Sequence, residues 1–208
     1  MSAAPLTIEQ MQMKYNAQVS RLLVQGFRGK FQSLTNMKDD DLALFFEKLL
    51  DHYPHEPFGR RMVVLLEGIV VGTMSIQWKG DSDPELKRKP LSWKSFNRFG
   101  KWNLMKMMLG LHFLEHKPQA GECYIADLVV HSDHRGIGVG TNLLQWAKQY
   151  VQAEPHLDVL SLFVSGHNER ARHLYEQLSF HTKFQRSSLA RHIFFRERKW
   201  NYMVLRLK

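Results

Sequence analysis

A glycine-rich turn, Arg-Gly-Ile-Gly-Val-Gly at residues 135–140, separates two segments with different hydrophobic periods. Residues 124–130 before it form an apolar run typical of a buried strand, and the residues from Thr141 onward have the spacing of an amphipathic helix. Glycines let the chain turn tightly and leave backbone N–H groups uncovered. The unpaired amides and the positive dipole end of a new helix attract a phosphate. This order of strand, turn and helix predicts an anion site, suited to a pyrophosphate, in a fold that combines strands with helices.

Two familiar phosphate-binding motifs do not fit this turn. A dinucleotide-binding motif needs a third glycine at a different offset and an acidic residue about 20 residues later, and a P-loop needs Gly-Lys-Ser/Thr. Glycine also occurs wherever φ is positive. The turn alone therefore does not decide between a phosphate site and a tight connection without a ligand.

The rest of the chain predicts a mixed sheet flanked by helices. Strands are predicted at residues 6–11, 61–66, 69–78, 122–131, 158–164, 180–185 and 200–207. Helices are predicted at residues 14–28, 39–49, 101–116, 138–153 and 168–178. Residues 6–11 also fit a helix start, because Thr7 with Gln10 mimics a capping box. The alternation of strands with helices favours an α/β (α+β) architecture.

Length and composition are those of an ordinary globular protein. The 208 residues suffice for one domain with a substantial core, so a single domain over residues 1–208 is expected. The only cysteine, Cys123, excludes an internal disulfide framework. With no recognisable export segment and no apolar stretch long enough to span a bilayer, a cytoplasmic location without membrane association is expected. The net charge of +9 favours a polyanionic ligand.

A second pattern follows the turn at the positions Val164, Asn168, Ala171, Leu174, Tyr175 and Phe180. With Arg135, Gly138 and Gly140 of the first block, it resembles the GNAT family of acyl-CoA-dependent N-acetyltransferases. The resemblance covers roughly residues 122–184. One position departs from the family pattern, because Ser179 stands where the family has a glycine before Phe180. That position is a helix exit, where glycine is merely the easiest residue.

The resemblance implies the fold and the co-substrate. The expected fold is a single GNAT-type domain with a mixed, mostly antiparallel central sheet of about seven strands flanked by helices. The expected co-substrate is acetyl-CoA, and no metal is expected. The implied cofactor-binding residues are Leu128, Val129, Val130, Arg135, Gly136, Ile137, Gly138, Val139, Gly140, Thr141 and Asn168.

The resemblance also implies a role for each part of this site. The backbone of Leu128, Val129 and Val130 is expected to bond the pantetheine arm, which would lie between two diverging strands. The amides of residues 136–141 are expected to hold the pyrophosphate. Asn168 is expected to cap its helix and to touch the pantetheine arm, although capping alone would account for an asparagine there.

Tyr175 stands where the family commonly places the tyrosine that protonates the departing CoA sulfur. The reaction is the attack of an amine on a thioester, so a neutral amine, an oriented carbonyl and a proton for the thiolate are needed. The alternative is a tyrosine packed for its ring, with its hydroxyl bonded to a carbonyl.

The sequence does not identify the general base. Many family members carry a glutamate on the strand before the turn, but the corresponding positions hold Tyr124 and Ala126. Strand alternation sends Asp127 to the opposite face unless a bulge intervenes, and its carboxylate is expected to bond neighbouring amides or a cation. Glu122 is expected to be solvated. A remote acid acting through water, or an amine already partly neutral, would serve equally well.

The insertion at residues 79–121, between the third and fourth strands, is the feature most peculiar to this chain. It is too long for a plain hairpin connection, and its helix-like part is apolar nearly all round. Such a helix must be covered. We expect a wall or lid over the acceptor side, and a dimer contact or a core extension are the alternatives.

Other residues are expected to be structural. Cys123 has no histidine partner by spacing, so a small buried residue is favoured over an acyl-enzyme nucleophile. The histidines lack paired ligand spacing. Residues 183–199 carry a basic cluster around Phe194 and Phe195, which is expected to be a solvated loop or to line an acidic surface or the adenosine phosphate of CoA.

The leading hypothesis is an enzyme that transfers the acetyl group of acetyl-CoA to a primary amine by direct attack in a ternary complex. The alternative is a non-catalytic acyl-CoA sensor on the same scaffold. No nucleic-acid partner is expected, because charge is present without a recognised binding module. A monomer or a homodimer is expected, and the acceptor stays open among protein N-termini, lysine side chains, small amines and aminoglycosides.

Overall fold

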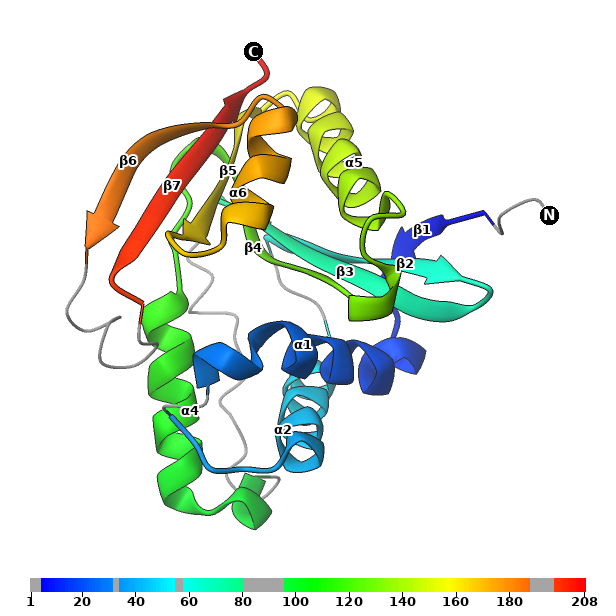
Figure 1. Ribbon diagram of the computed structural model, residues 1–208, viewed down its shortest axis with the longest axis vertical. Coiled ribbons are helices and arrows are strands. Elements are labelled where there is room, and N and C mark those ends of the chain that lie inside the picture. Colours follow the sequence, from blue (N-terminus) through cyan, green and yellow to red (C-terminus); the bar gives the residue numbers. More distant parts are fainter. Residues whose placement is uncertain (1–4, 32–33, 55–57, 81–95, 188–196) are drawn as a thin grey trace.

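The computed structural model describes residues 5–31, 34–54, 58–80, 96–187 and 197–208. Its centre is a seven-stranded sheet in the order β1-β2-β3-β4-β5-β7-β6 (Figure 1). The strands are β1 (Thr7–Gln10), β2 (Gly59–Leu66), β3 (Ile69–Trp78), β4 (Gly121–Val130), β5 (Leu157–Ser165), β6 (His181–Ser187) and β7 (Lys199–Arg206). Every neighbouring pair is antiparallel except β4 and β5, which are parallel. The predicted mixed, mostly antiparallel sheet is confirmed.

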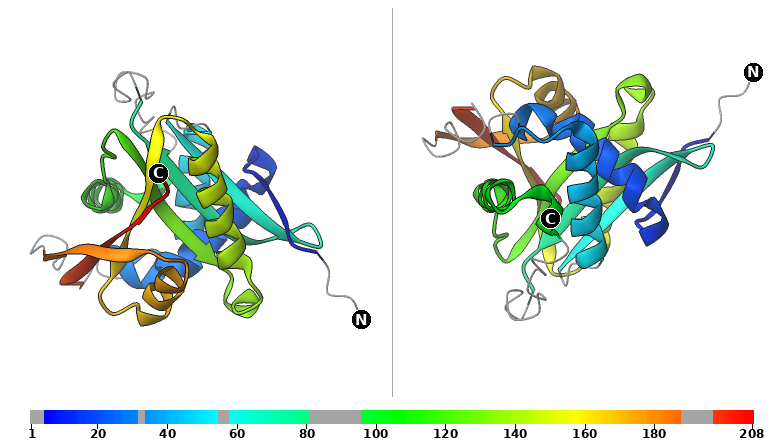
Figure 2. Two further views of the ribbon diagram at one scale, coloured as in Figure 1. Left: turned by 90° about the horizontal axis from the view of Figure 1, so that it is seen from above. Right: turned by 90° about the horizontal axis from the view of Figure 1, so that it is seen from below.

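Five helices of the described residues cover this sheet. They are α1 (Asn16–Phe31), α2 (Asp39–His52), α4 (Lys101–Leu114), α5 (Val139–Ala153) and α6 (Glu169–Gln177). Helices α5 and α6 lie on one face, and α1, α2 and α4 lie on the other (Figures 1 and 2). The core is divided accordingly, because one apolar cluster joins α1, α2 and α4 to Val129 and another joins α5 and α6 to Ile125. A parallel strand pair needs a crossover connection, which α5 supplies between β4 and β5.

The local predictions agree with these elements to within a few residues. The segment before α1 is a strand, not a helix start, and a 3₁₀ turn at Met13–Tyr15 leads into the helix. The hairpin between β2 and β3 turns at Glu67 and Gly68, with φ of 51° and 80°. Positive φ at both central residues belongs to the hairpin turns that match strand twist.

Helix α4 of the insertion packs into the core on one side only. Leu104 and Met107 are buried in the cluster that α1 and α2 form. Trp102, Met105 and Leu109 on its other side are 64%, 45% and 42% exposed. Within the chain the inner side of this helix extends the core, and the outer side is exposed, so the expected cover for that side stays a prediction. Residues 81–95 of the insertion lie outside the described residues.

Candidate functional site

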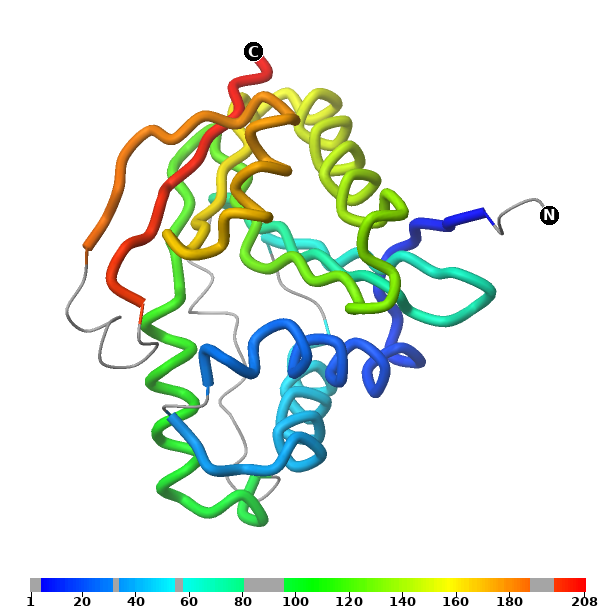
Figure 3. The backbone as a smooth tube through the Cα atoms, in the orientation of Figure 1, coloured from blue at the N-terminus to red at the C-terminus, as the bar shows by residue number. Residues whose placement is uncertain are grey.

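Strands β4 and β5 begin side by side and then separate. Their pairing runs from Gly121 opposite Leu157 to Ile125 opposite Leu162. Beyond it β4 stays with β3 as far as Val130, while β5 stays with β7 as far as Ser165. The chain trace in Figure 3 shows the two strands parting towards α1. This split has the form expected between the two strands that flank the glycine turn and its helix.

A bulge in β4 lies where the split begins. Ser75 of β3 faces Asp127 and Ile76 faces Ile125, so Ala126 is the extra residue. The bulge resets the alternation of side chains, and Asp127 therefore lies on the α1 face with Tyr124. The Asp127 carboxylate accepts one hydrogen bond from each Nη of Arg61, both at 2.7 Å, in a bidentate pair. The expectation that this carboxylate bonds a cation is confirmed.

The glycine turn leaves a run of amides without acceptors. Gly136 and Gly138 have φ of 87° and 90°, a conformation that suits glycine, and α5 begins directly after Gly138. The first helical hydrogen bond is donated by the Asn142 N–H to the Gly138 carbonyl. No acceptor in the described part of the chain receives the N–H groups of residues 136–141. The first turn of α5 also lacks acidic residues, so nothing there repels an anion.

The remaining residues of the turn hold it in place. Ile137 is 53% exposed, whereas Val139 is buried against β3. Arg135 donates from Nε to the Val130 carbonyl at 3.3 Å, which joins the turn to the end of β4. A side-chain carbon at Gly140 would come within 3.4 Å of Leu174, so the two motif blocks touch through α5 and α6.

Tyr175 lies on the same face of the sheet as the turn. Its side chain is buried, with the ring centroid 5.8 Å from that of Phe180. Its hydroxyl has no hydrogen-bond partner among the described residues, so the alternative of a hydroxyl bonded to a carbonyl is not observed there. Burial raises the pKa of Tyr175 to about 12, which keeps the phenol protonated.

The helix that carries Tyr175 is closed at both ends by motif positions. The Asn168 side chain caps α6 by accepting from the Ala171 N–H at 3.2 Å, as expected. Ser179, the departure from the family pattern, has a φ of 69°. Serine therefore adopts the left-handed conformation that glycine adopts most easily after a helix.

Glu122 is buried, so the expectation that it is solvated is wrong. Its carboxylate receives hydrogen bonds from the Gln119 N–H at 2.8 Å, the Ser161 hydroxyl at 2.5 Å and the Tyr202 hydroxyl at 2.6 Å, and it lies 3.0 Å from Nε2 of His116. Burial alone would raise the pKa of Glu122, but these hydrogen bonds lower it to about 2. The prediction failed because β5 and β7, which are distant in sequence, cover this end of β4.

A cavity of about 230 Å³ opens on the α1 face. It is lined by Gly26, Gly29 and Lys30 of α1, by Ser165 at the end of β5, and by Glu197 and Trp200. Burial lowers the pKa of Lys30 to about 8, against the opposing attraction of Asp127 and Glu197. Sequence reasoning missed this cavity, because its walls come from both ends of the chain.

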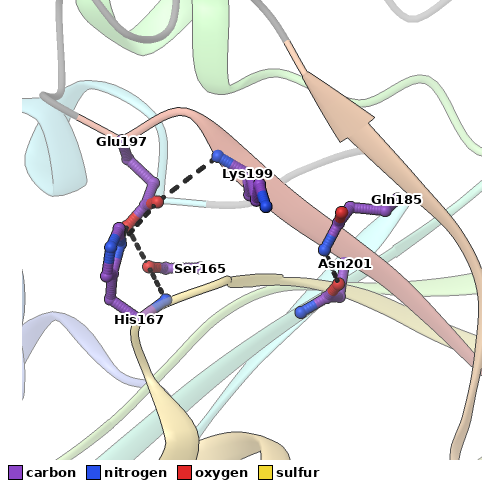
Figure 4. A network of polar contacts seen from close by, with 6 residues as sticks. All are labelled: Ser165, His167, Gln185, Glu197, Lys199 and Asn201. Carbon is purple, nitrogen blue, oxygen red and sulfur yellow. Dashed lines mark hydrogen bonds and ion pairs between the residues drawn. The ribbon is translucent and has the colours of Figure 1, made fainter.

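Polar contacts tie one wall of the cavity together (Figure 4). The Ser165 hydroxyl donates to the Glu197 carboxylate, and Nδ1 of His167 lies 2.9 Å from the same carboxylate. Phe194 and Phe195 of the expected basic loop lie outside the described residues. Lys199, at the end of that loop, begins β7.

Three further observations bear on the chemistry. Cys123 is buried, and burial raises the pKa of its thiol to about 12, which fits a structural residue. Within the described ranges, no group of His, Cys, Asp and Glu side chains could hold a metal. None of the described helices is both long and apolar enough to cross a bilayer.

Comparison with known proteins agrees with this arrangement. Residues 25–180 match the model of the acetyltransferase (GNAT) family. No curated protein matches the chain by sequence. Among solved structures, spermidine N-acetyltransferase from Vibrio cholerae in complex with CoA and spermine is 16% identical, with a TM-score of 0.61 over 97% of this chain and 95% of that chain. The ribosomal-protein-S18-alanine N-acetyltransferase from Escherichia coli is 12% identical, with a TM-score of 0.58 over 98% and 95% of the two chains. Arabidopsis thaliana NAA60 in complex with acetyl-CoA is also 12% identical, with a TM-score of 0.61 over 98% and 100%.

At such identities the likeness of structures establishes the fold alone. The family model goes further, since it covers more than half of the sequence, including both motif blocks. The protein belongs to the acetyltransferase (GNAT) family.

Proposed function

We propose that this protein transfers the acetyl group of acetyl-CoA to a primary amine by direct attack in a ternary complex. The observation that carries the proposal is the run of unpaired amides at residues 136–141, beside the split between β4 and β5. Several aligned N–H groups at a helix start form a preorganised site for a diphosphate.

In this proposal acetyl-CoA binds along the glycine turn and the split between β4 and β5. Its diphosphate binds the amides of the turn, and its pantetheine arm lies in the split against the backbone of Leu128, Val129 and Val130. Asn168, at the start of α6, borders the same split and contacts the arm in addition to capping its helix. Arg135 contributes positive charge near the diphosphate, and no metal takes part.

Tyr175 assists departure of the thiolate. The amine nitrogen forms a bond to the thioester carbon, the carbon–sulfur bond breaks, and the sulfur gains a proton. A phenol that stays protonated and has an unpaired hydroxyl is suited to donate to the sulfur as negative charge develops. Since the pKa of a free thiol is about 8.5, the transfer depends on close geometry at that moment.

The acceptor approaches on the face opposite α5. The cavity beside Lys30 and Glu197 lies there, on the far side of the split from the glycine turn. The spermidine and ribosomal-protein enzymes of similar fold act on amines, which supports an amine acceptor for this protein. We expect activity in the cytoplasm, as a monomer or a homodimer.

The test is release of CoA thiol from acetyl-CoA across a panel of amines. The panel contains protein N-terminal peptides, lysine peptides, polyamines, aminoglycosides and small amines. We expect turnover with at least one acceptor, and a fall of 10-fold or more for Tyr175→Phe. Tyr150→Phe is the matched control, because burial also raises the pKa of Tyr150 to about 12 but its ring stacks on Trp146 in α5.

Calorimetry run beside the turnover assay distinguishes a transferase from a non-catalytic acyl-CoA sensor. Acetyl-CoA binding in calorimetry without turnover on any amine would favour a sensor. Equal turnover by Tyr175→Phe and the wild-type protein would remove the role of the tyrosine and leave the transferase intact.

A further inference from the structure

We propose that His116 accepts the proton of the acceptor amine, with the buried Glu122 positioning its imidazole. This inference rests on the proposed function and supplies the general base that the sequence does not reveal. His116 belongs to the connection between α4 and β4, within the insertion.

The imidazole of His116 lies where the split begins. Its ring centroid is 4.4 Å from that of Tyr124 on β4 and 5.6 Å from that of Phe163 on β5. Phe163 directly follows Leu162, the last residue of β5 that pairs with β4. A group that contacts both strands at this point is near the closed end of the split, on the α1 face.

The contact with Glu122 determines the tautomer of His116. An ionised carboxylate only accepts hydrogen bonds, so the Nε2 that lies 3.0 Å from Oε1 carries the proton. In the neutral ring Nδ1 is then the basic nitrogen. The pairing is the arrangement by which a carboxylate orients a catalytic histidine, with its second nitrogen left to act on the substrate.

Nδ1 is available for this purpose. The side chain of His116 is 20% exposed, and its only polar partner among the described residues is Glu122. In the part of the chain that the structure describes, the titratable groups in contact with it are Glu122 and Tyr124 of β4 and Tyr202 of β7, whose ring centroid is 5.9 Å away. The hydrogen bond to Glu122 keeps the ring in place when Nδ1 takes a proton.

The cavity lies on the same face, a short distance along the same strands. Phe163 and Tyr202, which contact His116, are paired with each other, and Ser165 and Trp200, which line the cavity, form a pair farther along β5 and β7. An amine that moves from the cavity towards the split therefore approaches His116.

Two other carboxylates near the split and the cavity, Asp127 and Glu197, are already bound by neighbouring side chains. Both oxygens of Asp127 accept from Arg61, and Glu197 accepts from Ser165 and contacts His167. The proton balance is complete with His116 as base. The attacking nitrogen loses a proton to Nδ1 and the sulfur gains one from Tyr175. The imidazolium then gives its proton to water, and the Tyr175 phenolate regains one from water, so both residues return to their starting state.

The experiment measures kcat/KM against pH for thiol release, with the best amine found in the panel. We compare the wild-type protein with His116→Gln, which can still donate to Glu122 but has no basic nitrogen. We expect a loss of about 10²- to 10³-fold at neutral pH, and a smaller loss at high pH, where solvent deprotonates the amine. The affinity for acetyl-CoA should change less than twofold in calorimetry.

Two further measurements exclude a merely structural role. His156→Gln removes a histidine that also faces a glutamate, Glu154 at 3.8 Å, but at the far end of β5, and it should leave the profile unchanged. Nitrogen NMR of the wild-type imidazole should show the proton on Nε2 of His116, and Glu122→Gln should change that signal.

Three results would overturn the inference. They are a loss of activity in His116→Gln that is the same at every pH, a proton found on Nδ1 in the neutral ring, and loss of the pH dependence in Lys30→Met but not in His116→Gln. Failure of the wild-type protein to acetylate any amine would instead defeat the proposed function, and the role of His116 with it.

Discussion

At the scale of single residues, this site depends on the backbone more than on side chains. Gly136 and Gly138 place their amides through positive φ angles, and a side-chain carbon at either position would meet no other atom within 4 Å. Another residue would therefore have room for its side chain, but its backbone would be strained at a positive φ. A substitution at the turn can therefore be compared with one at a glycine elsewhere that has the same backbone strain but lies away from the proposed site.

Gly138→Ala should weaken acetyl-CoA binding by about 10-fold, because strain at this position moves the first amides of α5. The matched control is Gly68→Ala in the β2–β3 hairpin, which has a φ of 80° and the same open surroundings. Both substitutions should lower the free energy of unfolding by about 1–2 kcal/mol, but only Gly138→Ala should raise the Kd measured by calorimetry. Equal affinities in the two variants would contradict an anion site at the turn.

Ser179→Gly should raise the free energy of unfolding by up to about 1 kcal/mol, because glycine adopts a φ of 69° without the penalty that serine carries. Chemical denaturation measures the change. Ser187→Gly, at the exposed end of β6, is the control and should be neutral or slightly destabilising. A loss of stability in Ser179→Gly would mean that the serine side chain contributes more than its backbone strain takes away.

At the scale of elements, two irregularities position the site. The bulge at Ala126 brings Asp127 to the α1 face, where it binds Arg61. Helix α1 approaches β4 closely at Gly26, where a side-chain carbon would lie 2.6 Å from Val129. Val129 belongs to the part of β4 that is predicted to bond the pantetheine arm, so the packing of α1 supports that segment.

Gly26→Ala should destabilise the protein by about 1–3 kcal/mol through overpacking against Val129. Gly29→Ala, one turn farther along α1, meets nothing within 4 Å and should stabilise the helix by up to about 1 kcal/mol. Thermal unfolding of the two variants should therefore shift in opposite directions. A stabilising effect of Gly26→Ala would show that α1 can move away from the sheet at little cost.

At the scale of the whole molecule, the two halves of the sheet join at the start of β4. Glu122 on β4 accepts hydrogen bonds from Ser161 on β5 and Tyr202 on β7, so one buried carboxylate links three strands. The whole chain has a formal net charge of +9, which favours anionic ligands. Both the stability of the fold and the position of the proposed base, His116, therefore depend on Glu122.

Acid stability should depend on Glu122. Its pKa is about 2 in the folded protein against 4.5 for the unperturbed group, so its contribution is complete above about pH 5 and is lost as the pH falls towards 2. Urea denaturation across this range should show a steeper loss for the wild-type protein than for Glu122→Gln, which is less stable at neutral pH by about 2–3 kcal/mol. The exposed Glu169→Gln is the control. Parallel profiles for the wild type and Glu122→Gln would show that the carboxylate titrates normally.

The elements of the fold and the two motif blocks could be predicted from sequence. Hydrophobic period, glycine and capping residues act over a few neighbours, so the strands, the helix starts at Gly138 and Asn168, and the turn between them follow from local chemistry. The family resemblance singled out Tyr175, and the absence of a histidine partner by spacing favoured a buried Cys123. The sequence could not state whether the amides of the turn are free or the tyrosine hydroxyl is unpaired, because both depend on what packs around them.

Tertiary structure alone determined the cavity and the surroundings of His116. His116 and Glu122 are close in sequence, but the side chains that bury Glu122 come from β5 and β7. The cavity joins Lys30 near the start of the chain to Glu197 near its end. Sequence determined which residues form strands and helices, because those preferences are local. The register of the strands, the bulge at Ala126 and the packing of α1 determined which distant side chains meet, and no local pattern encodes those contacts.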